Sequence, residues 1–406
     1  MILQPLTRVY ALDNGLGRVP PMGFNTWNAF NCDIAEHIVL DTVKVVQDLG
    51  LDKVGYTYIN LDDCWMAHQR DTTTGLYVAD PDRFPRGMKF LGDYLHKRNL
   101  KFGIYTSAGV KTCAGYPGSL YHEVQDAQTF AEWGVDYLKY DNCYNDGIPG
   151  IDRYTAMRDA LNATGRPIFF SLCQWGEEES WKWAPAIGNS WRTTQDIAPR
   201  WNSIVGNFFK SQQHAERSQP GAWLDPDMLE VGNGKLTLDE CKSHFAMWCF
   251  VKAPLLLGND LTKMTSEILA VVSNVNLIGI NQDPGTKQAT CYVGRCSQSG
   301  TQSFSIFATT TGSGVTVALI INWDDKEATA TNFTIAGQDV AVVPTPNQAI
   351  VVEDLWASTV VGEYDFEGLK TVPVPSIPPH GCAVYSFRSE VREELKSDEL
   401  AFSLRH

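Results

Sequence analysis

The chain has 406 residues, of which 44% are hydrophobic and 20% are charged, so it is long enough to bury the core of one large domain and a smaller one. Its 33 basic and 47 acidic residues give a formal net charge of −14 and a pI near 5.0. This balance argues against nucleic acid and anionic membranes as partners, because both repel an acidic surface. A neutral substrate is compatible with it, and a homo-oligomer is left open.

The sequence favours export from the cell. No stretch of 18 consecutive apolar residues occurs, so no transmembrane helix is expected. The first twenty residues lack the pattern of a signal peptide, whereas Asn162 and Asn332 each begin a glycosylation tripeptide and ten cysteines are present. We therefore expect a mature secreted glycoprotein from which the signal peptide is absent. The alternative is a cytosolic protein in which both tripeptides occur by chance.

From residue 22 to about residue 283 the sequence alternates short β-like runs with helical patterns, which is typical of parallel β/α units. We expect strands at residues 23–27, 56–62, 101–106, 135–141, 167–173, 190–193, 222–224 and 254–257. The intervening helical patterns cover residues 35–49, 87–98, 123–133, 150–162, 200–218, 237–251 and 264–273.

Eight such units over roughly 260 residues predict a (β/α)8 TIM barrel, which we assign to residues 1–288. An open doubly wound sheet is the alternative. That fold usually carries a glycine-rich phosphate loop after its first strand, and the sequence FNTWN at residues 24–28 is not such a loop. The α/β class with a closed barrel is therefore the better prediction.

A second, all-β pattern follows the barrel. Residues 303–308, 315–323, 328–335, 341–343, 349–354, 371–374 and 383–387 are β-rich, and no helical pattern separates them. We predict a C-terminal antiparallel β-sandwich domain at residues 289–389. The turn at residues 375–380 is expected to be structural, and residues 390–406 form a charged C-terminal tail whose KSDEL sequence is not at the chain end.

Carboxylates follow several of the predicted strands. Asp62 and Asp63 follow the second, Asp141 ends the fourth, Asp196 follows the sixth, and the seventh is followed by Asp225 and Asp227. A single aspartate at a strand end is most often a turn or a helix cap. Six at one barrel rim instead suggest acid-catalysed cleavage of a glycosidic bond, which requires two carboxylates on either side of the bond.

Other side chains at the same rim fit carbohydrate. Lys139 lies two residues before Asp141, so both point into the barrel, where the ammonium needs carboxylates or hydroxyls as partners. Arg192 is at the end of the sixth strand. Tryptophans 27, 65, 175 and 223 are at or just past strand ends, where their rings either stack on a sugar or pack in the core.

The cysteines predict disulfides between rim loops. Cys32 and Cys64 follow the first and second strands, and Cys113 and Cys143 follow the third and fourth, so each pair can join neighbouring loops. Cys291 and Cys296 can close a small hairpin. Of the remaining four, Cys173 ends the fifth strand at the rim. Cys241, Cys249 and Cys382 are compatible with buried free thiols, and their pairing is left open.

The sequence offers no evidence for a metal or another cofactor. It contains no His-Glu-x-x-His, no Cys-x-x-Cys, no dense histidine cluster and no Gly-x-Ser-x-Gly turn. The carboxylates are therefore expected to act without a metal.

Taken together, these residues resemble the family 27 glycoside hydrolases, the α-galactosidases, over nearly the whole chain. The motifs that carry the resemblance are PMGFNTW at residues 21–27, DDCW at 62–65, GIY at 103–105, KYDNC at 139–143, WRTTQD at 191–196, DPDML at 225–229, APLLL at 253–257 and NQD at 281–283. The resemblance implies that Asp141 is the nucleophile and Asp196 the general acid/base of a retaining mechanism.

The resemblance also implies a galactose pocket. Asp62, Asp63 and Lys139 would bind the 4- and 6-hydroxyls, while Cys173 and Trp175 would crowd the 2-hydroxyl and so favour galactose over an N-acetyl sugar. The pocket would be completed by Trp27, Tyr105, Cys113, Arg192 and Asp227. Gln174 departs from the glutamate that is usual in the family, so the preference for the leaving group or the pH optimum is expected to differ.

Three alternatives remain at this stage: an α-N-acetylgalactosaminidase, a β-L-arabinopyranosidase of the same family, and a barrel that binds galactose without cleaving it. The retaining mechanism further predicts an ionised Asp141 supported by Lys139 and Arg192, a raised pKa for Asp196, and carboxyl groups separated by roughly 5 to 6 Å.

Overall fold

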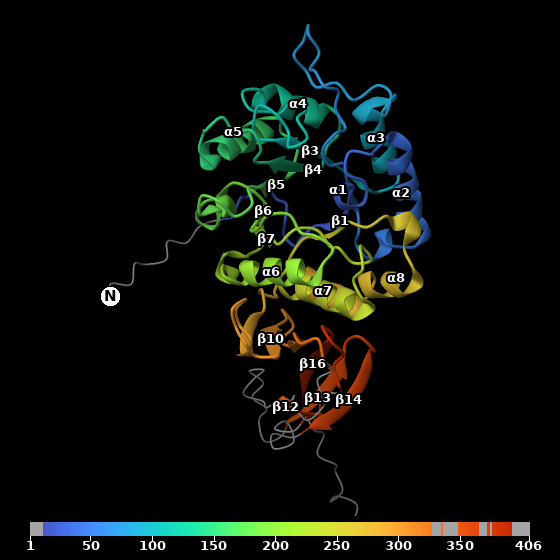
Figure 1. Ribbon diagram of the computed structural model, residues 1–406, viewed down its shortest axis with the longest axis vertical. Helices are drawn as coiled ribbons and strands as arrows, with labels where there is room; N and C mark the ends of the chain where they lie inside the picture. The colour runs from blue at the N-terminus through green and yellow to red at the C-terminus, as the bar shows by residue number, and fades with distance from the viewer. Residues whose placement is uncertain (1–10, 327–333, 336–347, 365–371, 374–375, 392–406) are drawn as a thin grey trace, which may run out of the picture.

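The computed structural model describes residues 11–326, 334–335, 348–364, 372–373 and 376–391 (Figure 1). Its larger part is a barrel of eight parallel strands in the order β7-β6-β5-β4-β3-β2-β1-β8, so the predicted barrel is confirmed. The strands are β1 (Met22–Asn25), β2 (Tyr58–Asn60), β3 (Lys101–Ser107), β4 (Tyr137–Asp141), β5 (Phe169–Cys173), β6 (Ser190–Arg192), β7 (Trp223–Asp225) and β8 (Leu255–Leu257). All eight overlap predicted strands.

The last strand, β8, pairs differently with its two neighbours, β1 and β7. β1 pairs in parallel with β8 from Met22 opposite Leu255 to Phe24 opposite Leu257. Between β7 and β8, the described residues form one bridge, from Leu229 to Leu257, and Leu229 is four residues beyond the end of β7. Pro226 has no N–H for a ladder, and Asp227 has a positive φ of 84° that turns the chain. The boundary between β7 and β8 is therefore where the segment after β7 enters the rim.

Helices cover the outside of the barrel (Figure 1). They are α1 (Trp27–Phe30), α2 (Glu36–Asp48), α3 (Gly87–His96), α4 (Glu123–Glu132), α5 (Gly150–Ala163), α6 (Trp201–Gln212), α7 (Leu238–Phe250), α8 (Ser266–Val272) and α9 (Val275–Gln282). The sequence did not predict α1 or α9, which are 4 and 8 residues long, because so few turns show little periodicity. None of the helices in these ranges is long and apolar enough to cross a membrane.

The C-terminal part is β-structure, as predicted. A six-stranded antiparallel sheet has the order β14-β13-β16-β11-β10-β9, and β12 pairs with β15 separately. The strands are β9 (Thr290–Gly294), β10 (Phe304–Thr310), β11 (Thr316–Asn322), β12 (Thr334–Ile335), β13 (Gln348–Asp354), β14 (Thr359–Tyr364), β15 (Val372–Pro373) and β16 (Cys382–Val391). β9 and β14 were not predicted, and both are exposed strands at the edges of this sheet.

Some predictions fall on residues that the structure leaves undescribed. The strand expected at residues 341–343, the glycosylation site Asn332 and tail residues 392–406 lie outside the described ranges. The numerical domain limits, 1–288, 289–389 and 390–406, stay predictions.

The two faces of the six-stranded sheet have different neighbours. Side chains alternate along a strand, and in β11 Val317, Leu319 and Ile321 belong to the barrel's hydrophobic core, whereas Ala318 and Ile320 belong to a separate core on the opposite face. The barrel side packs against α6 and α7, which lie directly above the sheet in Figure 1. Phe307 of β10 stacks edge-on against Phe208 of α6, with 5.0 Å between ring centroids. The two parts therefore share one core.

The structure contains the three predicted disulfides, Cys32–Cys64, Cys113–Cys143 and Cys291–Cys296. The first joins the loops after β1 and β2, and the second joins the loops after β3 and β4. The four remaining cysteines are free thiols, and those at positions 173, 241 and 249 are buried. The first two disulfides therefore tie together the loops around the barrel rim.

We expect Phe307→Ala to lower the free energy of unfolding by about 3 to 5 kcal/mol, because it removes a fully buried ring and leaves a cavity between the sheet and α6. Denaturant unfolding followed by tryptophan fluorescence measures this loss. Val360→Ala on β14, where the side chain is 60% exposed, is the matched control and should change stability little. Equal effects of the two variants would contradict the shared core.

Candidate active site

The register of the barrel brings the predicted site residues together at one rim. Asp141 of β4 lies beside Ser107 of β3 and Cys173 of β5, and one layer deeper Lys139 lies beside Tyr105. Because side chains alternate along a strand, Lys139 and Asp141 both point into the barrel. These residues therefore lie together at one rim of the barrel.

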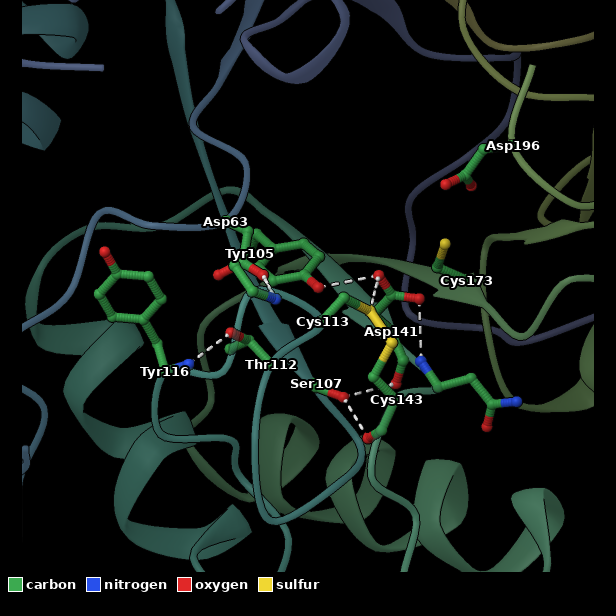
Figure 2. Close-up of a disulfide and its surroundings, with 12 residues drawn as sticks. Asp63, Tyr105, Ser107, Thr112, Cys113, Tyr116, Asp141, Cys143, Cys173 and Asp196 are labelled. Atoms are coloured by element: carbon green, nitrogen blue, oxygen red, sulfur yellow. Dashed lines mark hydrogen bonds between the residues drawn. A yellow bond between two sulfur atoms is a disulfide. The ribbon is translucent and has the colours of Figure 1, made fainter. Parts of the chain in front are cut away.

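Asp141 is buried and held by several neighbours (Figure 2). The Tyr105 hydroxyl donates a hydrogen bond of 2.8 Å to its Oδ2, and the Asn142 N–H donates one of 2.9 Å to its Oδ1. Cys113 Sγ, which is in a disulfide, lies 3.2 Å from Oδ2. Burial raises the pKa of Asp141 more than Lys139 and these hydrogen bonds lower it, so the pKa lies above its ordinary value. The carboxylate is thus less acidic than we expected.

The ammonium of Lys139 is paired with Asp62. Its Nζ lies 2.8 Å from Asp62 Oδ2, which also accepts a hydrogen bond of 2.8 Å from Asn25 Nδ2. Burial lowers the pKa of Lys139, but Asp62 and the neighbouring Cys173 and Asp141 raise it more, so the side chain stays charged. The partner that the buried lysine required is therefore present.

Asp63 is turned toward the loop after β3. It accepts backbone hydrogen bonds of 2.7 Å from the Cys64 N–H and 2.9 Å from the Ala114 N–H, which follows Cys113. Burial raises its pKa to about 6, although these hydrogen bonds oppose the shift. Asp63 therefore connects the two disulfide-bonded loops on this side of the rim.

Arg192 connects the second group of carboxylates. Its buried Nη2 lies 3.0 Å from both Asp196 Oδ1 and Asp227 Oδ2, and its Nη1 lies 3.5 Å from Cys173 Sγ. The two aspartates differ in exposure: the Asp196 side chain is 68% exposed and that of Asp227 is 5% exposed. Figure 2 shows the Asp196 carboxyl group facing the space above Cys173 and Asp141.

The pKa of Asp196 differs from our expectation. Burial raises it, but the positive charges of Arg192 and Lys139 lower it more, so it lies below its ordinary value. Our prediction of a raised pKa considered the proton that the residue must donate and overlooked the guanidinium in contact with it. In the substrate-free protein, Asp196 is therefore the more acidic of the two carboxyl groups.

The segment after β7 supports the loop that carries Asp196. Asp227 Oδ2 accepts a hydrogen bond of 2.8 Å from the Ile197 N–H, and the Asp227 carbonyl accepts one of 2.7 Å from Trp248 Nε1 of α7. Asp225 in turn accepts a hydrogen bond of 2.8 Å from the Asp227 N–H, and burial raises the pKa of Asp225 to about 6. Asp225 is thus part of the site, although we singled it out only as a strand-end residue.

The four tryptophans that we expected at the rim divide into two classes, and Trp223 is the first residue of β7, at the opposite end of that strand from Asp225. Trp65 and Trp223 are fully buried, and their Nε1 atoms donate to backbone carbonyls, of Tyr105 at 2.8 Å and of Gly17 at 2.7 Å. Core packing is therefore the correct interpretation of both. Trp27 and Trp175 are only partly buried, and Trp175 has a positive φ of 63°. The two tryptophans that the family resemblance places in the pocket are thus the ones with exposed surface.

Gln174 follows Cys173, and its side chain is fully buried. Neither its amide nitrogen nor its amide oxygen has a hydrogen-bond partner among the described residues. A glutamate in the same place would be a buried charge without a donor or a cation, which costs several kcal/mol more than an amide. The glutamine is therefore the less costly residue for this environment.

A buried carboxyl group that we did not anticipate joins two other loops. Glu230 accepts hydrogen bonds of 2.8 Å from Asn28 Nδ2 of α1 and 2.5 Å from Asn233 Nδ2. Its backbone N–H donates to Nε2 of the buried His244 at 2.9 Å. Burial raises the pKa of Glu230 to about 7. Glu230 thus links the helix that contains Trp27 to the segment that contains Asp227.

No group of three or more histidines, cysteines, aspartates or glutamates among the described residues is arranged to hold a metal ion. The two cations at the rim are instead paired with carboxylates. Lys139 has Asp62, and Arg192 has Asp196 and Asp227.

Glu230 makes the stability of the protein depend on pH. A carboxyl group whose pKa is higher in the folded than in the unfolded chain stabilises the fold when it is protonated, and this contribution is lost as the pH rises from about 4.5 to about 7. In the wild type, this effect should lower the free energy of unfolding by at most about 3 kcal/mol across this pH window, and Glu230→Gln should abolish the decrease. Thermal unfolding of the wild type and the variant between pH 4 and 8 measures it. Glu132→Gln on the surface of α4 is the control, and parallel pH curves for the wild type and Glu230→Gln would contradict the assignment.

Known proteins share this fold and much of this sequence. The family model described as alpha galactosidase A matches residues 19–283. The chain is 52% identical over 273 residues to alpha-galactosidase 3 of Arabidopsis thaliana. This match covers 67% of the chain and 62% of the length of that relative. It is 42% identical over 380 residues to an alpha-galactosidase of Oryza sativa, covering 92% of this chain and 86% of the relative.

Among solved structures, an α-galactosidase of Saccharomyces cerevisiae with raffinose superposes with a TM-score of 0.79 at 33% identity. The superposition covers 94% of this chain and all of that chain. The family match, the rice relative and this superposition agree with one another and with the motifs around the rim. The chain belongs to the α-galactosidase family of glycoside hydrolases.

Proposed function

We propose that this protein is a retaining exo-α-galactosidase that removes terminal α-D-galactosyl groups from oligosaccharides and galactomannans. The observation that carries this proposal is the pair Asp141 and Asp196, of which the first is held by Tyr105 and the second by Arg192, and both face the same space at one rim (Figure 2). The α-galactosidase names of the relatives, and the raffinose bound to the yeast enzyme, support the substrate class.

In the first step, Asp141 attacks the anomeric carbon while Asp196 gives its proton to the departing glycosidic oxygen. A bond forms between an Asp141 oxygen and the sugar, and the bond to the leaving group breaks. Water then attacks the galactosyl-enzyme while Asp196 accepts a proton, which frees Asp141 and retains the anomeric configuration. Because the first displacement must be reached without an intervening water, the carboxyl groups should lie about 5 to 5.5 Å apart.

The paired charges below these carboxylates suit the hydroxyls of galactose. Asp62, Asp63 and Lys139 offer acceptors and a donor for the 4- and 6-hydroxyls, and Tyr105, Cys113, Arg192, Asp227 and Trp27 complete the pocket. An analogue that lacks one of these hydroxyls would leave a buried group unpaired, which lowers kcat/KM by a factor on the order of 10⁴. The arrangement therefore selects for the sugar by its hydroxyls.

The exposure of Asp196 explains how it can act as an acid despite its low pKa. Substrate binding covers a side chain that is 68% exposed in the free protein and removes its water. Desolvation of a carboxylate raises its pKa. The proton is therefore held more tightly in the complex than in the free enzyme.

The alternatives fit the same rim less well. Cys173 is buried against Arg192 and Trp175 follows in a left-handed conformation, which leaves little room for an N-acetyl group at the 2-position. Asp62 and Asp63 are both present for a 6-hydroxyl, which the sugar of a β-L-arabinopyranosidase lacks. A barrel that only binds galactose has no need for Asp196 as well as Asp141.

We further propose that the protein is secreted and that Asn162 carries a glycan. Asn162 is exposed near the end of α5, and three disulfides are more typical of an oxidising compartment than of the cytosol. Treatment of the secreted protein with an N-glycosidase, followed by peptide mass analysis, tests the site.

The activity is tested by release of nitrophenol from the aryl α-galactoside at pH 4 to 6, where the wild type should turn over and Asp141→Gly should not. Azide should restore activity to Asp141→Gly and yield the β-galactosyl azide, because a small anion can enter from the side that the carboxylate has vacated. The control is Asp146→Gly, an exposed residue of the loop after β4, which should behave as wild type. An inactive wild type would refute the enzyme, and an α-azide product would refute the role of Asp141.

The two pKa directions predict an unusual pH profile. The active form needs ionised Asp141 and protonated Asp196, yet Asp196 has the lower pKa, so the acid limb of kcat/KM should report Asp196 and the alkaline limb Asp141. In Asp196→Asn, only Asp141 titrates. Measured with an aryl galactoside that has a good leaving group, the alkaline limb should disappear and the acid limb should move to higher pH. An acid limb that stays in place would contradict this order.

A further inference from the structure

Arg153 is a charged side chain in an unusual environment. It lies in the first half of α5 and is only 1% exposed. No carboxylate of the described residues lies within ion-pair distance of its guanidinium, and its three hydrogen bonds all go to neutral acceptors. Burial of a charge without a countercharge costs several kcal/mol unless its hydrogen bonds are well formed. Such a residue is therefore a poor choice for stability alone.

The three acceptors belong to the loops that surround Asp141. Nε donates at 2.8 Å to the Ile148 carbonyl, in the loop between β4 and α5. Nη1 donates at 2.9 Å to the Ala108 carbonyl, directly after β3. Nη2 donates at 2.7 Å to the side-chain oxygen of Asn142, the residue that follows Asp141. The rigid guanidinium thus fixes two points of the loop after β4 relative to the end of β3.

Two of these acceptor residues hold Asp141 directly. The Ala108 N–H donates a hydrogen bond of 2.7 Å to the Asp141 carbonyl. The Asn142 N–H donates one of 2.9 Å to the Asp141 carboxyl oxygen Oδ1. Asp141 is therefore held at its backbone and at its carboxyl group by two residues that Arg153 connects.

Asn142 also extends the network toward Asp196. Its Nδ2 donates at 3.3 Å to Glu177 Oε2, in the loop after β5. Gln195, which precedes Asp196, donates at 3.4 Å from Nε2 to Glu177 Oε1. These longer contacts join the loop of one catalytic carboxylate to the loop of the other.

We propose that Arg153 is a positioning residue for the reaction, which sets the place of the Asp141 carboxylate through Ala108 and Asn142. This inference rests on the role of Asp141 proposed above. Arg153 does not touch the sugar in this scheme, so its loss should affect the attack on the anomeric carbon more than the binding of galactose. A displacement of about 1 Å at a reacting group lowers the rate by a factor on the order of 100.

The test replaces Arg153 with lysine, which keeps the charge but has one amino group in place of the planar fork. We expect kcat to fall by a factor on the order of 10 to 100 while KM changes by less than about threefold. Arg166→Lys is the matched control. Arg166 also donates to two backbone carbonyls, of Val135 and Gly134, but at the opposite end of β4. The Arg166→Lys variant should be less stable to heat than the wild type but should have the same kcat.

A second variant guards against misfolding of Arg153→Lys. Asn142→Ala removes the side-chain acceptor and retains the backbone N–H, so it should also lower kcat with little change in KM. Because both substitutions break the same connection between Arg153 and Asn142, kcat of the double variant should be little lower than kcat of the more impaired single variant. The inference would be overturned if the fold-decrease in kcat of the double variant equalled the product of the two single decreases. It would also be overturned if kcat of Arg153→Lys were as high as that of Arg166→Lys.

The outcomes separate this inference from the proposed function. If the wild type does not hydrolyse the α-galactoside, or Asp141→Gly is not rescued by azide, the proposed function fails. If the wild type is active and the rescue succeeds while Arg153→Lys and Asn142→Ala keep the wild-type kcat, only the positioning role of Arg153 fails. The loss in Arg153→Lys should also persist with a good leaving group, since the defect lies in the nucleophile and not in protonation.

Discussion

The largely enclosed ammonium of Lys139, whose side chain is 14% exposed, is the charge on which the rest of the rim depends. Its pKa is raised by Asp62, Asp141 and Asp227, which come from three different strands or the loops after them. Without the cation, these carboxylates would be buried like charges at close range, and one or more would have to take up protons. Without the carboxylates, the ammonium would be an uncompensated charge inside a barrel. The network therefore stabilises the site only as a complete set.

Arg192 repeats this arrangement on the other side of the pocket, and the two carboxyl groups that we propose as catalytic lie in different surroundings. Asp141 is buried and shares Lys139 with Asp62, so desolvation dominates and its pKa rises. Asp196 is exposed and contacts Arg192 directly, so the positive charge dominates and its pKa falls. In the mechanism that we propose, substrate reverses both environments, because the sugar removes water from Asp196 and its developing positive charge stabilises the anion of Asp141. Because Asp196 is exposed and Asp141 is buried, bound substrate can change which of the two carboxyl groups is the more acidic.

Much of this could be read from the sequence, because strand ends and side-chain alternation have short-range signatures. The barrel and the rim position of Asp62, Asp141 and Asp227 follow from local patterns. The disulfides Cys32–Cys64 and Cys113–Cys143, whose cysteines are 32 and 30 residues apart, follow from the order of the strands. The pairing between the segment after β7 and β8 could not be predicted from the sequence. It depends on the left-handed conformation of Asp227 and on a bridge from Leu229 to Leu257. Trp65 and Trp223 resembled pocket residues because their burial depends on partners distant in sequence. The direction of each pKa shift and the role of Arg153 likewise depend on which side chains meet in space.

The C-terminal sheet contributes to the site through α7. On one side of this helix, Trp248 donates to the Asp227 carbonyl and His244 accepts the Glu230 N–H, so α7 holds the segment that contacts both Arg192 and the Asp196 loop. On its other side, Ser243 donates at 2.6 Å to the His380 carbonyl, and Glu240 lies 2.8 Å from the His380 ring. Through His380, the described turn at residues 376–380 therefore braces the helix behind Asp227. A barrel without the sheet would expose the apolar face of α7 and lose this support, so the second domain belongs to the structural basis of the active site.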